Sequence, residues 1–255
     1  VGWAVVYLAT GFVLMLVFAG LGARFIPGVD RSNMAHLILL QSAGGLLGFG
    51  GMTWALGVRG LKLTLDELRY HPLTGAAPGF GLGFMLGAVP AAIAIGLSLV
   101  AGGASFQPDG GTTGDYLRSV AFTTLLLAPA ALVEELMFRG VGQVLLARVF
   151  GRVPAVLALS GLFALAHVLN PNSTALGLVN IALAGVFLGA AFYAPGGIWT
   201  AWGAHLGWNA TLAAVDAPVS GLPFPIPLID YQPGGPLWLT GGTFGPEGGL
   251  VATAG

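Results

Sequence analysis

Six polar residues in the second half of a very apolar chain have types and spacings that could do chemistry. An ionised side chain inside a membrane costs roughly a few kcal/mol, so each such residue is a candidate for function. Two acids and two histidines together could bind and deprotonate a water molecule, or they could hold a metal ion. The six residues are Glu134, Glu135, Arg139, His167, His205 and Asn209.

The two adjacent glutamates are expected to have unlike environments. Glu135 and Arg139 are four residues apart with the acid first, which is the favourable order for an ion pair on a helix. Glu134 points about 100° away around the same helix, so it cannot share that face. Such a difference separates a proton-transfer carboxylate from a structural one. The alternative is an ion pair that only fixes helix packing.

Two further pairs have the same spacing of four residues. Phe163 precedes His167, and His205 precedes Asn209, so each pair projects from one face of its helix. A single histidine in a membrane is more often a satisfied core residue than a catalyst. Two histidines with two glutamates on three separate segments favour a site. The sequence contains no HExxH and no GxSxG, which argues against a zincin helix and against a serine hydrolase.

The composition of the chain indicates a lipid environment for these residues. Of 255 residues, 56% are hydrophobic and 7% are charged, and the mean hydropathy is +0.87. A soluble domain carries roughly 25% charged residues. The absence of cysteine excludes disulfides, thiolate metal sites and a cysteine nucleophile. The formal net charge of −1 gives no reason to expect nucleic acid as a partner.

Long apolar segments predict an all-α, polytopic membrane bundle of about seven transmembrane helices, because a span needs about 20 mostly apolar residues. Between the second and third spans, Lys62–Tyr70 is expected to form a short amphipathic helix at the membrane surface. The expected spans are Trp3–Ala23, Met34–Val58, Phe80–Gly102, Ser119–Val133, Val153–Leu169, Ala175–Tyr193 and Ile198–Val215.

These spans divide the chain into three parts: N-terminal transmembrane helices (1–60), a core with the six polar residues (61–215) and a Gly/Pro-rich tail (216–255). The tail is expected to be mostly irregular and to have no chemistry of its own. The distribution of basic residues favours even-numbered loops on the cytoplasmic side and the tail outside. Eight arginines against one lysine indicate a GC-rich prokaryotic genome, hence a multi-pass protein of a prokaryotic plasma membrane.

Three ordered motifs on successive helices resemble those of a known family. Glu134–Arg139 matches EExxxR, Phe163–His167 matches FxxxH, and His205–Asn209 matches HxxxN. In this order they are similar to the motifs of the CPBP family of intramembrane proteases, also known as the Abi family. That family includes the type II CAAX prenyl endopeptidases and bacteriocin-processing or immunity proteins. The resemblance covers roughly Leu61–Val215, and each motif alone is weak.

The resemblance implies an intramembrane endopeptidase that hydrolyses a peptide bond near the membrane. It assigns Glu134 to the activation of water, with His167 helping to hold that water. Glu135, tied to Arg139, would shape the pocket, and Phe163 would pack beside it. His205 and Asn209 could donate hydrogen bonds to the developing oxyanion. The expected partners are the lipid bilayer and a peptide or membrane-protein substrate that enters from lipid.

Alternatives remain open for the metal and for the function. Glu134, His167 and His205 could form a His₂Glu zinc site, and members of the family are commonly labelled metalloproteases. The same residues suffice for a metal-free glutamate mechanism, which is the expectation here, with no cofactor required. The chain could instead be a proton-coupled membrane transporter, or a non-catalytic immunity or scaffold membrane protein.

Overall fold

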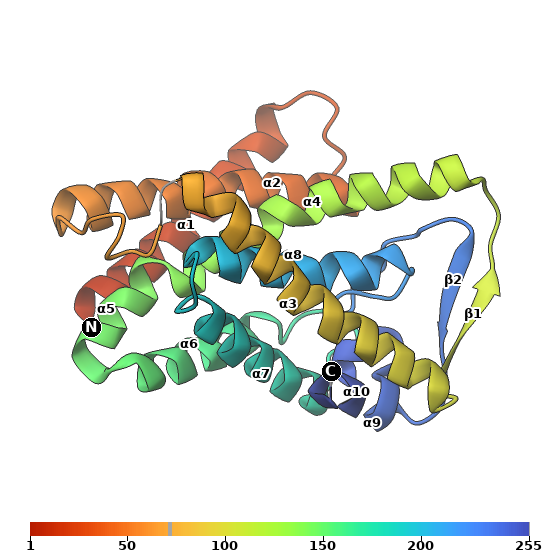
Figure 1. Cartoon of the computed structure of the whole chain (residues 1–255). Helices are drawn as coiled ribbons and strands as arrows, with labels where there is room; N and C mark the ends of the chain where they lie inside the picture. Colours follow the sequence, from red (N-terminus) through yellow and green to blue (C-terminus); the bar gives the residue numbers. More distant parts are fainter. Residues whose placement is uncertain (71–72, 255) are drawn as a thin grey trace.

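The protein is a bundle of helices with one small sheet, seen in a computed structural model that describes residues 1–70 and 73–254 (Figure 1). This architecture confirms the predicted all-α membrane fold. The α-helices are α1 (Gly2–Phe25), α2 (Met34–Gly45), α3 (Leu73–Val100), α4 (Thr113–Arg139), α5 (Val141–Phe150), α6 (Arg152–Ala166), α7 (Ala175–Ala191), α8 (Ile198–Ala214), α9 (Leu237–Thr240) and α10 (Leu250–Ala254). The other elements are η1 (Leu46–Gly50) and η2 (Thr53–Gly60), both π-helical, the 3₁₀ helices η3 (Gly242–Phe244) and η4 (Pro246–Gly248), and strands β1 (Ala104–Pro108) and β2 (Ile229–Pro233).

Each of the seven predicted spans coincides with a helix, but the helices differ in length. Within the described residues, four helical stretches are long and apolar enough to cross a membrane: Gly2–Phe25, Met34–Gly60, Gly75–Val100 and Thr113–Phe150. Helices α6, α7 and α8 have 15, 17 and 17 residues. At 1.5 Å per residue they are roughly 23–26 Å long, against a hydrocarbon core of about 30 Å. A count of seven spans therefore stays a prediction.

The segment Lys62–Tyr70 was expected to be a short helix, and that prediction is wrong. It forms a single turn at Leu65–Arg69, and Lys62 and Arg69 have positive φ angles of 53° and 56°. Left-handed residues end a helix, and here they bring the guanidinium of Arg69 to the end of α7. That guanidinium donates hydrogen bonds to three carbonyl groups just beyond α7, those of Phe192, Tyr193 and Ala194.

Close packing of α3 against α8 fixes the helix that carries two of the candidate site residues. Gly83 and Gly87 lie one turn apart on α3, and a Cβ atom at either would collide with the backbone of α8. Gly203 and Gly207 of α8 approach the backbone of α3 in the same way. Small residues at this spacing let two membrane helices touch along their backbones. The two helices therefore set the position of His205, which lies between the glycines of α8.

The C-terminal tail folds back onto the bundle. Strand β2 pairs antiparallel with β1, with Ala104 opposite Pro233 and Pro108 opposite Ile229. Beyond this sheet, α9 and α10 lie near the end of α7 (Figure 1). The high glycine and proline content suggested irregular backbone, yet the described tail forms one strand and four short helices. Burial of side chains such as Phe244 and Val251 holds these short elements in place.

Candidate active site

Helix α4 carries both glutamates near its C-terminal end. It begins at a capping box, in which Thr112 and Asp115 satisfy each other's backbone N–H groups. The helix then runs without interruption to Arg139 and breaks at Gly140, whose ψ angle is −131°. Glu134 and Glu135 therefore lie in the last two turns of a capped helix, on a rigid element.

Glu135 is the centre of a buried ionic cluster. Its Oε1 accepts a hydrogen bond from Nη1 of Arg139 at 3.1 Å and another from Nδ1 of His205 at 2.8 Å. The side chains of Glu135 and Arg139 are 0% and 1% exposed. The ion pair predicted from the four-residue spacing is thus present. The contact with His205 was not predicted, and it ties α4 to α8.

Glu134 faces the two histidines without such a bond. Its Oε2 lies 3.9 Å from Nε2 of His167 and 3.7 Å from Nε2 of His205. This oxygen has no hydrogen-bond partner among the described residues. The side chain of Glu134 is 33% exposed, in contrast to its neighbour. The structure therefore brings together Glu134 of α4, His167 just after α6 and His205 of α8, and leaves this carboxylate oxygen of Glu134 free.

The hydrogen bonds at Nδ1 determine the tautomer of each histidine, and therefore whether its Nε2 presents a hydrogen or a lone pair to Glu134. His167 follows the last residue of α6, and its Nδ1 lies 2.8 Å from the carbonyl oxygen of Phe163. A carbonyl oxygen only accepts, so Nδ1 of His167 carries the hydrogen, as does Nδ1 of His205 opposite the Glu135 carboxylate. In the neutral form of each ring, Nε2 then presents a lone pair. Two ring lone pairs and one carboxylate oxygen thus face a common point.

Phe163 packs against the polar groups of the site without a polar contact of its own side chain. Its ring centroid lies 4.6 Å from that of His167 and 6.0 Å from that of His205. The guanidinium of Arg139 lies 4.6 Å from the same ring. The side chain is buried. Phe163 therefore fixes the separation of the two imidazoles and covers the buried cation.

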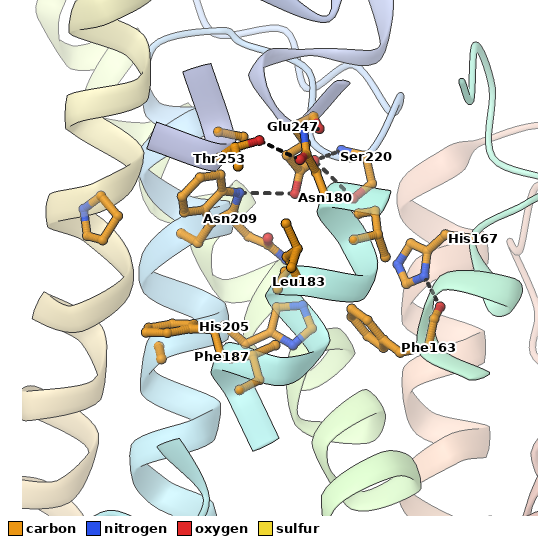
Figure 2. Close-up of a pocket in the computed structure, with 17 residues that line it drawn as sticks. Phe163, His167, Asn180, Leu183, Phe187, His205, Asn209, Ser220, Glu247 and Thr253 are labelled. Carbon is orange, nitrogen blue, oxygen red and sulfur yellow. Dashed lines mark hydrogen bonds between the residues drawn. The ribbon is translucent and has the colours of Figure 1, made fainter. Parts of the chain in front are cut away.

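A cavity of about 240 Å³ lies beside these residues, and His167, His205 and Asn209 line it (Figure 2). Asn209 is one helical turn from His205 on α8, as the spacing predicted. Glu134 is not among the lining residues, but its carboxylate is within 4 Å of both histidines that are. A substrate group in this cavity would therefore lie next to the polar cluster.

The motifs in the sequence did not indicate Glu247, which the tail places in the same cavity. This side chain is buried, and its Oε1 accepts a hydrogen bond from Nε1 of Trp208 at 3.0 Å. Its Oε2 accepts from the backbone N–H of Ser220 and from the Ser220 hydroxyl. Burial raises the pKa of the Glu247 carboxyl above its usual value. The only sequence signal was an acid in a tail without basic residues.

The three residues suggested as zinc ligands have suitable donor atoms, but these atoms lie farther apart than in a zinc site. Donors about 2.0–2.1 Å from a tetrahedral zinc ion lie roughly 3.4 Å from one another. Glu134 Oε2 is 3.9 Å and 3.7 Å from the two imidazole nitrogens. Across residues 1–70 and 73–254, no group of three or more His, Cys, Asp or Glu side chains could hold a metal ion. In this arrangement the carboxylate oxygen lies farther from the two nitrogens than zinc ligands lie from one another, and a metal at these residues stays a prediction.

Comparison with known proteins agrees with the motif resemblance. Residues 116–211 match the family model described as type II CAAX prenyl endopeptidase Rce1-like. The matched range runs from α4 into α8 and contains all three motifs. No curated protein and no solved structure matches the chain. Residues 116–211 of this membrane protein are therefore similar to the Rce1-like family of type II CAAX prenyl endopeptidases.

Proposed function

We propose that the chain is an intramembrane endopeptidase in which Glu134 and His167 activate a water molecule. The observation that carries this proposal is the difference between the two glutamates. Oε1 of Glu135 accepts hydrogen bonds from Arg139 and His205. Oε2 of each glutamate has no partner among the described residues, but only that of Glu134 lies within 4 Å of two imidazole Nε2 atoms. A free carboxylate at that position suits a general base.

The distance between Glu134 and His167 suits a shared water. Two hydrogen bonds of about 2.8 Å to one water place their acceptors about 4–5 Å apart. The observed 3.9 Å between Oε2 of Glu134 and Nε2 of His167 is close to that separation and too long for a direct bond. A water held by both acceptors would point its oxygen lone pairs away from them, toward a substrate carbonyl.

Hydrolysis then follows in two proton-balanced steps. The water oxygen attacks the carbonyl carbon, and one water proton passes to Glu134 as the tetrahedral intermediate forms. The carbon–nitrogen bond breaks, and the proton on Glu134 passes to the departing amine. The products are a carboxylic acid and an amine, and Glu134 returns to its starting state. Neither step requires a redox partner or a cofactor.

His205 and Asn209 are proposed to stabilise the oxyanion of the intermediate. The side-chain amide of Asn209 is a donor in any protonation state, and it lines the cavity. Nε2 of His205 can donate only in the imidazolium form, because Nδ1 already donates to Glu135. Glu135 and Arg139 act as positioning residues, since they fix the ring of His205 from behind.

The proposal gives no role to a metal and does not require a prenylated substrate. The observed donor separations are longer than those of zinc ligands, and the chemistry above needs only the protein side chains and water. The substrate is proposed to be a peptide or membrane protein that enters from lipid. The chain is proposed to be a multi-pass protein of a prokaryotic plasma membrane, with the bilayer as its solvent.

Quantitative proteomics of membrane fractions tests the proposed function in cells. Cells that carry the wild-type chain are compared with cells that carry Glu134→Gln, at matched abundance of the two proteins. We expect one membrane-associated precursor to accumulate in the variant, with loss of its shorter product. Identical peptide profiles would contradict a protease and favour a scaffold. A difference that disappears when the proton gradient is collapsed would favour a transporter.

A further inference from the structure

The tail supplies a buried carboxylate that has no counter-charge. Within the described chain, Glu247 forms no ion pair with lysine or arginine. The three donors around it satisfy its oxygens but do not neutralise its charge. A buried carboxylate is normally paired, because transfer of a lone charge out of water is costly.

The elements around the cavity cannot provide the missing cation. Helices α3, α7 and α8 and the tail contain no lysine or arginine. Arg152 opens α6, roughly 20 Å along the helix from its last turn. Arg139 already pairs with Glu135. The titratable groups that line the cavity with Glu247 are His167 and His205. The proposed mechanism needs His167 neutral to accept from water, and the charge of a His205 imidazolium is paired with Glu135.

The carboxylate is held in a fixed position at one side of the cavity. The side-chain amide of Asn180 donates to the backbone carbonyls of Glu247 and Gly249, at 2.9 and 2.8 Å. The hydroxyl of Thr253 donates to the amide oxygen of Asn180 at 2.7 Å. Figure 2 shows Glu247 beside Ser220 and Asn180, on the side of the cavity away from His205. The tail is therefore clamped onto α7, and Glu247 is preorganised.

The rest of the cavity wall suits an aliphatic chain. Most of the remaining lining belongs to α7 and α3 and is apolar, namely Ile181, Leu183, Ala184, Phe187, Leu188 and Pro90. An apolar wall with one fixed anion fits a ligand with a hydrocarbon stem and a cationic end. The stem is stabilised by contact with the apolar wall, and the positive charge is neutralised by the anion. Lysine and arginine side chains have this form.

We infer that the cavity is a specificity subsite for a basic side chain of the substrate, with Glu247 as the counter-charge and α7 as the wall for its aliphatic stem. The inference rests on the proposed endopeptidase function and names its substrate class: peptides with lysine or arginine close to the scissile bond. Glu247 lies outside residues 116–211, so the tail would give this chain a selectivity that the matched domain does not contain.

A binding experiment tests the subsite without requiring proteolysis. Purified full-length protein in an uncharged detergent is titrated with hexylammonium chloride, and the midpoint of thermal unfolding is followed. Hexanol serves as the control for apolar partitioning into micelles. For Glu247→Gln we expect the apparent affinity for hexylammonium to fall by about tenfold or more, with hexanol unaffected. Asp66→Asn removes an exposed carboxylate that does not line the cavity, so it should retain ammonium binding. Equal hexylammonium affinity in the wild type and Glu247→Gln overturns the inference.

A cleavage experiment on the wild type avoids any folding defect of the variant. The substrates are peptides that are identical except at one position close to the scissile bond, which is lysine, norleucine or glutamate. The kcat/KM values of the three peptides are compared. We expect lysine peptides to be preferred and glutamate peptides to be rejected. Cleavage without a preference for lysine overturns the subsite and leaves the proposed function standing. If no peptide is cleaved but hexylammonium binding depends on Glu247, the subsite holds and the endopeptidase proposal fails.

Discussion

The polar cluster around Glu134 and Glu135 has two halves with different environments, although these two glutamates are adjacent in sequence. In the fixed half, Glu135 and Arg139 are 0% and 1% exposed and joined by a direct hydrogen bond. In the open half, the side chains of Glu134 and His167 are 33% and 12% exposed, and their facing atoms are 3.9 Å apart. One residue step along α4 separates a carboxylate that holds structure from one that is free to react.

This difference shows how a helix can serve stability and chemistry at once. The fixed half ties α4 to α8 through His205 and to α7 through the bond from Arg139 to the carbonyl of Gly185. The open half depends on that frame, because His205 faces Glu134 with its other nitrogen. Substitutions in the fixed half should therefore affect folding, and substitutions in the open half should affect only turnover.

The largest effect on stability is expected for Arg139→Ala. Removal of the guanidinium leaves Glu135 as a buried charge without its cation, which typically costs about 3–5 kcal/mol. Thermal unfolding in detergent measures the loss. The matched control is Arg148→Ala, which breaks the exposed pair with Glu67 and should leave the melting temperature nearly unchanged. Equal melting temperatures for Arg139→Ala and the wild type would show that the Glu135–Arg139 pair does not stabilise the fold.

A smaller effect, on turnover and not on folding, is expected for Asn209→Ala. Loss of one oxyanion donor costs about 10²–10³ in kcat, equivalent to about 2.7–4 kcal/mol. Because this donation matters in the transition state, KM should change little. Steady-state kinetics on a cleaved peptide, with the melting temperature as a folding control, provides the measurement. A rise in KM with unchanged kcat would assign Asn209 to substrate binding instead.

The smallest effect is expected from removal of metal ions. A glutamate–water enzyme should keep its rate after dialysis against a chelator and contain no stoichiometric metal. A zinc enzyme should lose activity and regain it when zinc is returned, with weaker metal binding at low pH. Mass spectrometry of the purified protein, before and after dialysis, gives the metal content. One equivalent of zinc whose removal abolishes cleavage would contradict the metal-free proposal.

Local patterns in the sequence predicted one part of this site and not the other. Apolar length predicted the helices, and the spacing of four residues predicted the Glu135–Arg139 pair, because both depend on neighbours along one helix. The bond between Glu135 and His205 joins residues 70 positions apart. Pairing of β1 with β2 and the insertion of Glu247 likewise depend on how distant segments pack. No periodicity in the chain encodes these contacts.

The rate of peptide hydrolysis by purified Glu134→Gln, relative to the wild type in the same detergent, tests the central claim most directly. Glutamine keeps the size of the side chain and removes the general base. The account predicts a fall of roughly 10²–10⁴-fold in kcat, with an unchanged melting temperature because Oε2 of Glu134 makes no hydrogen bond within the described residues. Wild-type turnover by a correctly folded Glu134→Gln variant would contradict it.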